Sequence, residues 1–235
     1  AAMWLYDLTG AARIGRLHKR ISPEAVSRHM PTLRRERLGP AYLYYDAQAD
    51  DARLTLQIAR TAALDFGATV VNHVEVVALC KNAAGRVDGA DVQDPSGRRI
   101  VVRARTVVNA TGVWSDAVRA LDDPAEPSRL RPAKGVHITV PWTTTRNDVA
   151  VIVPGPDRRP VFIVPWMPQP DGTFAFTYVG TTDTLYDGDV DDPRCTDEDL
   201  AYLLAAVNGC VSQPLDTSDV VGTWAGLRPL VADAD

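Results

Sequence analysis

Apolar residues in the first third of the chain recur at helical spacing in two places. The longer stretch covers residues 51–66, where two aspartates lie at the positive end and Gly67 can close the helix. Ser22, followed by Pro and Glu, predicts the start of a shorter helix that runs to about Met30. Because the longer helix is amphipathic, we expect it to pack one face on a sheet.

Short runs rich in β-branched residues follow the longer helix, separated by Gly, Asn, Asp and Pro. These runs predict a meander of strands at residues 69–71, 75–79, 86–93 and 99–108. The last run leads through an apolar strand into Ala110-Thr111-Gly112, where a helix is predicted to begin.

The second half of the chain alternates differently and predicts a mixed or antiparallel sheet with few helices. One helix is expected at residues 198–208, capped by Thr196 or Asp197. The pattern is that of an α/β to α+β protein. Its strands are expected near residues 136–140, 149–153, 161–164, 174–179 and 220–224.

Composition narrows the classes of function. The chain has 235 residues and a net charge of -5, which argues against nucleic acid as a partner. Basic clusters at residues 16–20 and 34–37 could contact anionic lipid, but we interpret them as solvated faces. Three cysteines without pairing motifs indicate reduced thiols in the cytoplasm. No metal-ligand spacing is present, so we expect no metal site.

The stretch at residues 107–116, VVNATGVWSD, indicates flavin chemistry. Small side chains at Ala110 and Gly112 would let the backbone approach a bulky planar cofactor. No GxGxxG turn occurs anywhere in the sequence, so we expect the other half of the cofactor site to lie outside this chain. The first residues, Trp4 to Leu8, read as a helix start without a cap, and the last follow a strand-like stretch, which indicates an excised fragment.

Six ordered motifs together resemble FAD-dependent glycerol-3-phosphate dehydrogenases. The resemblance covers the chain from Tyr44 onward, and the segment before it is similar to the family's helical connection. The motifs are YYDAQADDARL, VVNATGVWSD, RPAKGVHITV, FIVPW, VGTTDT and TWAGLRPL.

The resemblance implies a substrate-binding domain with a mixed or antiparallel sheet and part of a glutathione-reductase-like FAD domain. It implies a helical connection at residues 1–43, a partial FAD-binding segment at 44–115 and a substrate-binding cap at 116–235. The implied reaction oxidises sn-glycerol 3-phosphate to dihydroxyacetone phosphate, with hydride transfer to FAD and electrons passed to quinone. Peripheral contact with the cytoplasmic face of a membrane is also implied.

This chemistry needs a cation for the phosphate and a base for the hydroxyl proton. The resemblance places Arg228 at the phosphate and His137, on the face of its strand opposite Val136 and Ile138, at the hydroxyl. Lys134 could add a second charge or be an ordinary solvated lysine. Thr182 and Asp183 could orient the hydroxyls or cap a turn.

On the cofactor side, the candidates are Ala110, Thr111, Gly112 and Trp114, with the backbone near Val74 implied by the resemblance. Trp114 could equally be a packing residue. Two other functions remain open. An amine or amino-acid oxidase of the same superfamily could use the arginine for a carboxylate, and the isolated fragment could be a non-catalytic binding module.

Overall fold

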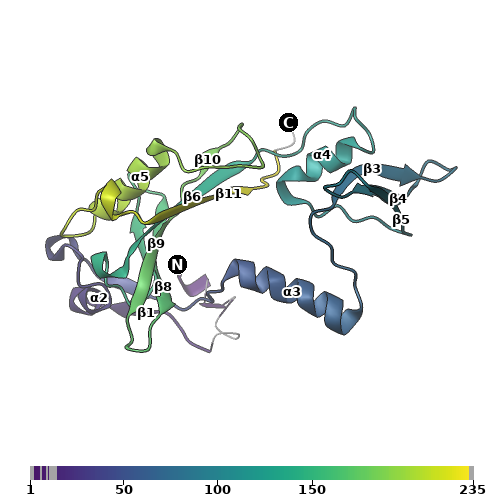
Figure 1. Cartoon of the computed structure of the whole chain (residues 1–235). Helices are drawn as coiled ribbons and strands as arrows, with labels where there is room; N and C mark the ends of the chain where they lie inside the picture. Colours follow the sequence, from purple (N-terminus) through teal and green to yellow (C-terminus); the bar gives the residue numbers. More distant parts are fainter. Residues whose placement is uncertain (1–2, 6, 9, 11–14, 233–235) are drawn as a thin grey trace. The chain divides into compact units, whose positions relative to one another are not determined.

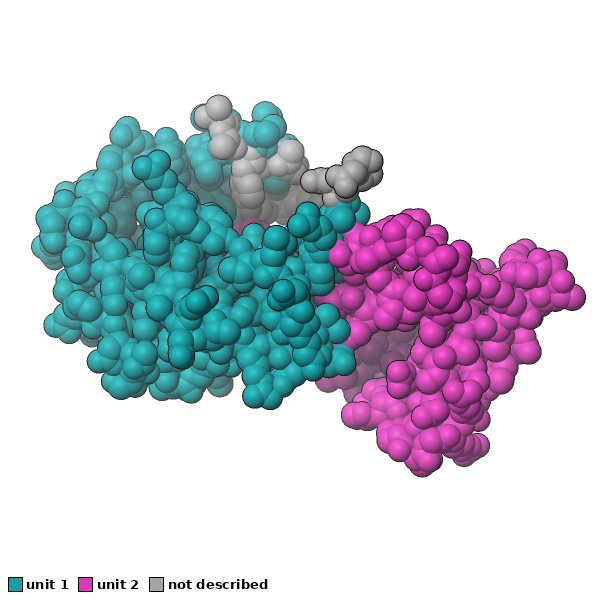
Figure 2. Space-filling model, turned by 90° about the horizontal axis from the view of Figure 1, so that it is seen from above, with its two compact units in different colours: residues 1–45, 131–235 teal, residues 46–130 magenta. Residues whose placement is uncertain are grey.

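The computed structural model describes residues 3–5, 7–8, 10 and 15–232, and it divides the chain into two compact units. The large unit comprises residues 1–45 and 131–235, and the small unit comprises residues 46–130 (Figures 1 and 2). The prediction of a helix beginning at Trp4 falls partly on residues outside the described ones; residues 3–5 and 7–8 are helical.

A six-stranded antiparallel sheet forms the centre of the large unit. Its strand order is β10-β6-β9-β8-β7, and β11 pairs with β6 on the edge opposite β10. The strands predicted for the second half are therefore confirmed, and the strand pairs that the structure describes in this sheet are all antiparallel. The strands are β6 Ala133–Pro141, β7 Val151–Pro154, β8 Pro160–Pro168, β9 Phe174–Gly180, β10 Thr184–Leu185 and β11 Gly222–Arg228.

The core of the large unit lies on one face of this sheet. Val136, Ile138 and Val140 of β6 are fully buried, as the alternation of the strand predicts. Helix α5, Asp197–Asn208, supplies Leu203 and Val207 to the same cluster. Thr196 caps α5, and a reciprocal bond from the Thr196 amide to Asp199 completes a capping box.

The first residues of the large unit form more than a helical connection. Helix α2, Pro23–His29, begins at the Ser22 cap as predicted, and a two-stranded sheet joins β1, Lys19–Ile21, to β2, Ala41–Leu43. Met30 and Leu33, which follow α2, are buried in the core of the large unit. Residues 1–45 therefore belong to the same compact unit as residues 131–235, and Met30 and Leu33 help to complete its core.

The small unit contains the predicted meander. Strands β3 Glu75–Lys81, β4 Val87–Gln93 and β5 Arg99–Arg103 pair in antiparallel order. Two expectations are wrong: residues 69–71 form no strand, and β5 ends at Arg103 instead of continuing to Val108. Among the described residues, β5 pairs with β4, and the ladder ends at the pair of Arg103 with Gly89, two residues from the start of β4. Little of β4 is therefore left for the chain beyond Arg103 to pair with.

Residues 116–130 belong to the small unit, although the sequence placed them with the cap. Helix α4, Ser115–Ala120, follows the 3₁₀ helix η2, Gly112–Trp114. The Asp116 carboxylate accepts hydrogen bonds from Ser128 Oγ and from the amides of Arg129 and Leu130. These bonds lower the pKa of Asp116 to about 2 and tie the segment back onto α4.

Helix α3, Asp51–Phe66, has the predicted ends but not the predicted packing. Asp50 caps its first turn, and Gly67 closes it in the left-handed conformation with φ of 67°. None of its residues is buried, and Leu56 and Phe66 are 59% and 81% exposed. The three short strands of the small unit pair with each other, and no described sheet covers the apolar face of α3.

Among the described residues, no helix has the length and apolar character needed to cross a membrane. No cluster of three or more candidate ligands for a metal ion occurs in the described part of the chain.

Candidate active site

His137 lies on the face of the large sheet opposite the core. On β6, even-numbered residues from Val136 to Val140 are buried, whereas His137 and Thr139 are half-buried on the other face. The predicted orientation of His137 is confirmed. The strand thus presents an imidazole on the outer face while its apolar residues hold β6 against the core.

The immediate neighbours of His137 come from the two strands that flank β6. Gly180 of β9 and Trp224 of β11 are its direct cross-strand partners. The Trp224 indole is stacked on the imidazole, with 4.9 Å between ring centroids and an interplanar angle of 10°. Tyr178 meets the imidazole edge-on at 5.6 Å.

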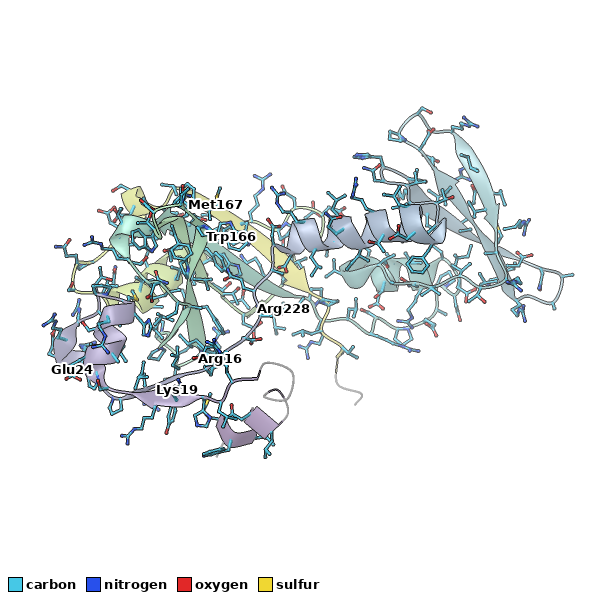
Figure 3. The ribbon with its side chains drawn as sticks, turned by 90° about the horizontal axis from the view of Figure 1, so that it is seen from below. Arg16, Lys19, Glu24, Trp166, Met167 and Arg228 are labelled. Atoms are coloured by element: carbon cyan, nitrogen blue, oxygen red, sulfur yellow. The ribbon has the colours of Figure 1, made fainter. Side chains whose placement is uncertain are left out.

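Arg228 projects over the same face of the sheet. Its Nη1 atom lies 3.2 Å from Asp183 Oδ1 and 3.5 Å from the carbonyl oxygen of Thr182. A Cβ atom at Gly135 would lie 2.9 Å from both terminal guanidinium nitrogens. Because Gly135 has no side chain, the guanidinium can lie against β6 next to the row that holds His137. Figure 3 shows the Arg228 side chain on β11 and that of Trp166 on β8.

The environment keeps the imidazole uncharged. Burial lowers the pKa of His137 below its ordinary value, and the positive charge of Arg228 lowers it further. A neutral imidazole has a free lone pair, so it can accept a proton near neutral pH. The outer face therefore joins a fixed cation to a group that can act as a base.

Lys134 lies on the opposite face and does not fit the predicted place at the substrate. It is 6% exposed, and its ammonium is 2.6 Å from Asp199 Oδ2 and 3.1 Å from the carbonyl oxygen of Arg194. Burial acts to raise the pKa of Asp199, but the hydrogen bonds from Lys134 and Thr196 outweigh it and leave that pKa lowered. Lys134 therefore neutralises a buried carboxylate beneath the sheet.

Thr182 is also occupied by the fold, whereas Asp183 is exposed. The Thr182 hydroxyl accepts from the amide of Val136 at 3.0 Å and lies 3.4 Å from the carbonyl oxygen of Lys134. These bonds attach the chain after β9 to β6. The Asp183 carboxylate pairs with Arg228, so of the two predicted residues it is the one whose side chain contacts the candidate cation.

The cofactor candidates lie in the small unit. Gly112 adopts φ of 58°, and a Cβ atom there would meet no atom within 4 Å. Ala110 and Gly112 are exposed, and Asn109 holds the turn by accepting from the Thr111 hydroxyl at 2.7 Å. Val74 and Trp114 expose apolar side chains. The open space at Gly112 and the exposed backbone of this turn leave room for a planar group such as a flavin.

Sequence reasoning missed the aromatic and glycine neighbours of His137. The alternation of β9 and β11 could have placed Tyr178 and Trp224 on one face of their strands, but only the register of three strands makes them neighbours of His137. Gly180 and Gly135 gave no local signal, because their importance lies in the side chains that cross above them.

The chain matches the model of a known protein family. The family described as FAD dependent oxidoreductase matches residues 2–235. The chain belongs to this family. Within it, the chain is 37% identical over 233 residues to glycerol-3-phosphate dehydrogenase 2 of Mycobacterium tuberculosis (strain ATCC 25618 / H37Rv), covering 99% of this chain and 38% of the relative. It is 35% identical over 238 residues to the mitochondrial glycerol-3-phosphate dehydrogenase of Homo sapiens, covering 97% of this chain and 32% of that protein.

Solved structures agree with this membership. Glycerol-3-phosphate dehydrogenase from Bacillus halodurans, solved in complex with FAD, matches with a TM-score of 0.81 and 35% identity over 91% of this chain and 42% of that one. Glycine oxidase from Bacillus cereus shares the fold with a TM-score of 0.68 at 20% identity, covering 97% of this chain and 57% of that one. The chain is thus a homologue of FAD-dependent glycerol-3-phosphate dehydrogenases that spans about a third to two fifths of their length.

Proposed function

We propose that this chain is the substrate-binding part of a flavoenzyme that oxidises sn-glycerol 3-phosphate to dihydroxyacetone phosphate. The observation that carries the proposal is that the Arg228 guanidinium and the His137 imidazole, whose pKa is lowered, lie on the same face of the large sheet. The 37% identity to a glycerol-3-phosphate dehydrogenase supports the choice of substrate.

In this proposal, Arg228 binds the phosphate group, because its planar fork matches phosphate oxygens in two simultaneous hydrogen bonds. Asp183 holds the guanidinium until the dianion replaces it, and its carboxylate then accepts from a glycerol hydroxyl. The His137 imidazole takes the proton of the C2 hydroxyl as the C2 hydrogen leaves as hydride. Lys134 and Thr182 keep β6 and the loop after β9 in place instead of contacting the substrate.

The small unit contributes to the FAD site in this proposal. Ala110, Thr111 and Gly112 would let their backbone approach the flavin, and Trp114 and Val74 would supply apolar contacts to it. The bound FAD supplies the hydride acceptor. The large unit then corresponds to the cap and the small unit to part of a glutathione-reductase-like FAD domain. Transfer of electrons to quinone, and with it contact with the cytoplasmic face of a membrane, belongs to the same proposal.

The test uses the full-length flavoprotein that contains this chain, purified with FAD. Glycerol 3-phosphate is added without oxygen while the visible absorbance of the oxidised flavin is followed. We expect rapid bleaching. Bleaching by glycine or another small amino acid, with none by glycerol 3-phosphate, would instead indicate an oxidase in which Arg228 binds a carboxylate. If no substrate bleaches the flavin, although this chain binds glycerol 3-phosphate in calorimetry, it acts as a binding module.

A further inference from the structure

The imidazole of His137 lies between an indole and a backbone that carries no side chain. We propose that Trp224 and Gly180 are positioning residues that hold this ring in one orientation on the outer face of the sheet. The inference rests on the proposed function in one respect: if His137 is the base, the held ring is the group that faces the substrate. The three residues form one row across β11, β6 and β9, because both neighbours are direct cross-strand partners of His137.

Gly180 makes room for the ring. A Cβ atom at this position would lie 2.1 Å from His137 Cδ2 and 2.6 Å from both Cγ and Nε2. Such distances lie far inside van der Waals contact, so an alanine forces either the ring or the strand to move. β9 is paired with β6 on one side and with β8 on the other, which leaves the strand little freedom. We therefore expect the imidazole to move.

Trp224 supplies the opposite wall, and other aromatic rings hold Trp224 in turn. Tyr178 meets both the imidazole and the indole edge-on, each at 5.6 Å between centroids. Trp166 of β8 meets Tyr178 at 5.7 Å. Edge-to-face and stacked contacts of this kind favour particular ring orientations. The cluster thus restricts the plane of the imidazole and keeps water from one side of it.

Trp224 is not a core residue. Its side chain is 46% exposed on the face opposite Val136, Ile138 and Val140, which form the core and are fully buried. Removing the indole should therefore leave the core of the large unit intact. Within the described part of the chain, the other titratable or charged groups beside the imidazole are Tyr178 of β9 and Arg228 of β11.

The test measures the titration of His137 by NMR in the chain labelled with ¹³C-histidine. The sequence has four histidines, and His137→Asn identifies the signal. In Trp224→Ala, water reaches the ring, so the pKa of His137 should rise toward its ordinary value of about 6.5, and the ring-current shift from the indole should disappear. Trp224→Phe should retain both effects in part.

Gly180→Ala tests the other wall, and Gly222→Ala is its matched control on β11. A Cβ atom at Gly222 would come no closer than 3.8 Å to its neighbour, Thr139. We expect Gly180→Ala to shift the His137 signal and its pKa and Gly222→Ala to leave both unchanged. Chemical shifts of the core valines report whether each variant is folded. If Trp224→Ala does not fold, Trp224→Phe takes its place in the test. If folded variants at both positions leave the His137 titration as it was, the inference is wrong.

A second measurement uses the full-length flavoprotein. Trp224→Ala should lower kcat for glycerol 3-phosphate and shift the acid limb of the pH profile, with KM nearly unchanged, and Trp224→Phe should restore most of the rate. An equal loss of kcat in Trp224→Ala and Trp224→Phe would contradict a positioning role. Because the NMR titration needs neither flavin nor substrate, it can support the inference even if glycerol 3-phosphate proves not to be the substrate.

Discussion

His137 combines features that suit a base and few that suit a packing residue. Its ring lies outside the core, it has a lowered pKa, and it shares a face with a guanidinium. Burial and the positive charge of Arg228 both lower the pKa of His137, so neither effect has to be large on its own. An acidic partner would instead hold the proton on the ring and block its use as a base.

Replacing His137 with Gln should therefore reduce turnover more than binding. General-base catalysis is typically worth about 10²–10⁴-fold in rate, and we expect kcat for glycerol 3-phosphate to fall by a factor in this range in the full-length enzyme. His29→Gln is the matched control, because His29 pairs with Asp148 on the surface. A His137→Gln enzyme with an unaltered kcat would remove His137 from catalysis.

The lowered pKa also fixes the direction of the pH dependence. The ring must be neutral to accept a proton, so kcat/KM should be constant around pH 7 and decline only below the ordinary histidine pKa of about 6.5. A pH profile of flavin reduction measures this limb. A decline that begins well above pH 7 would mean that the ring is charged at rest, contrary to its surroundings.

At the scale of elements, the helices were predictable because their signals are local. Ser22, Thr196 and Gly67 act at the ends of α2, α5 and α3 as the sequence indicates. The packing of α3 was not predictable. The spacing of its apolar residues indicates an apolar face that another element should cover, but it does not indicate whether this chain contains that element. The strand expected at residues 69–71 failed for a related reason, because β propensity forms no strand without a neighbour to pair with.

The buried pair between β6 and α5 should be sensitive to loss of one charge. Lys134→Met leaves Asp199 buried without its cation, which typically costs about 3–5 kcal/mol. We expect a clear fall in the free energy of unfolding, measured by urea denaturation. The lowered pKa of Asp199 adds a pH dependence: its contribution is present above the ordinary aspartate pKa of about 3.9 and is lost as the pH falls below it. Equal stability of Lys134→Met and the parent chain would mean that the pair contributes nothing.

Substitutions on the apolar face of α3 should have little effect on the free energy of unfolding. Phe66→Ser removes a side chain that is 81% exposed in this chain, so the free energy of unfolding should change by less than about 0.5 kcal/mol. Val207→Ala in α5 is the buried comparison and should cost more, because Val207 is fully buried. A large loss in Phe66→Ser would show that α3 is covered in solution.

At the scale of the whole molecule, the sequence predicted the sheet class and the family but not how the chain divides. Residues 1–45 and 131–235 form one unit although 85 residues of the other unit separate them in sequence. Local patterns carry no information about such long-range packing. The same limit applies to the candidate site: His137 and Arg228 were predicted from motifs, whereas Trp224, Gly180 and Gly135 become relevant only once β6, β9 and β11 are in register.

The central claim is that Arg228 binds the phosphate of the substrate. The most direct test compares the full-length Arg228→Ala enzyme with the parent enzyme in anaerobic flavin reduction. The quantity measured is the substrate concentration that gives half-maximal reduction. Hydrogen bonds to charged groups contribute about 1.5–3 kcal/mol, so this concentration should rise roughly 10- to 150-fold for glycerol 3-phosphate. It should stay the same for glycerol, which has no phosphate. Arg194→Ala, which breaks another exposed arginine–aspartate pair, should change neither value. An Arg228→Ala enzyme that keeps the parent value for glycerol 3-phosphate would contradict the account.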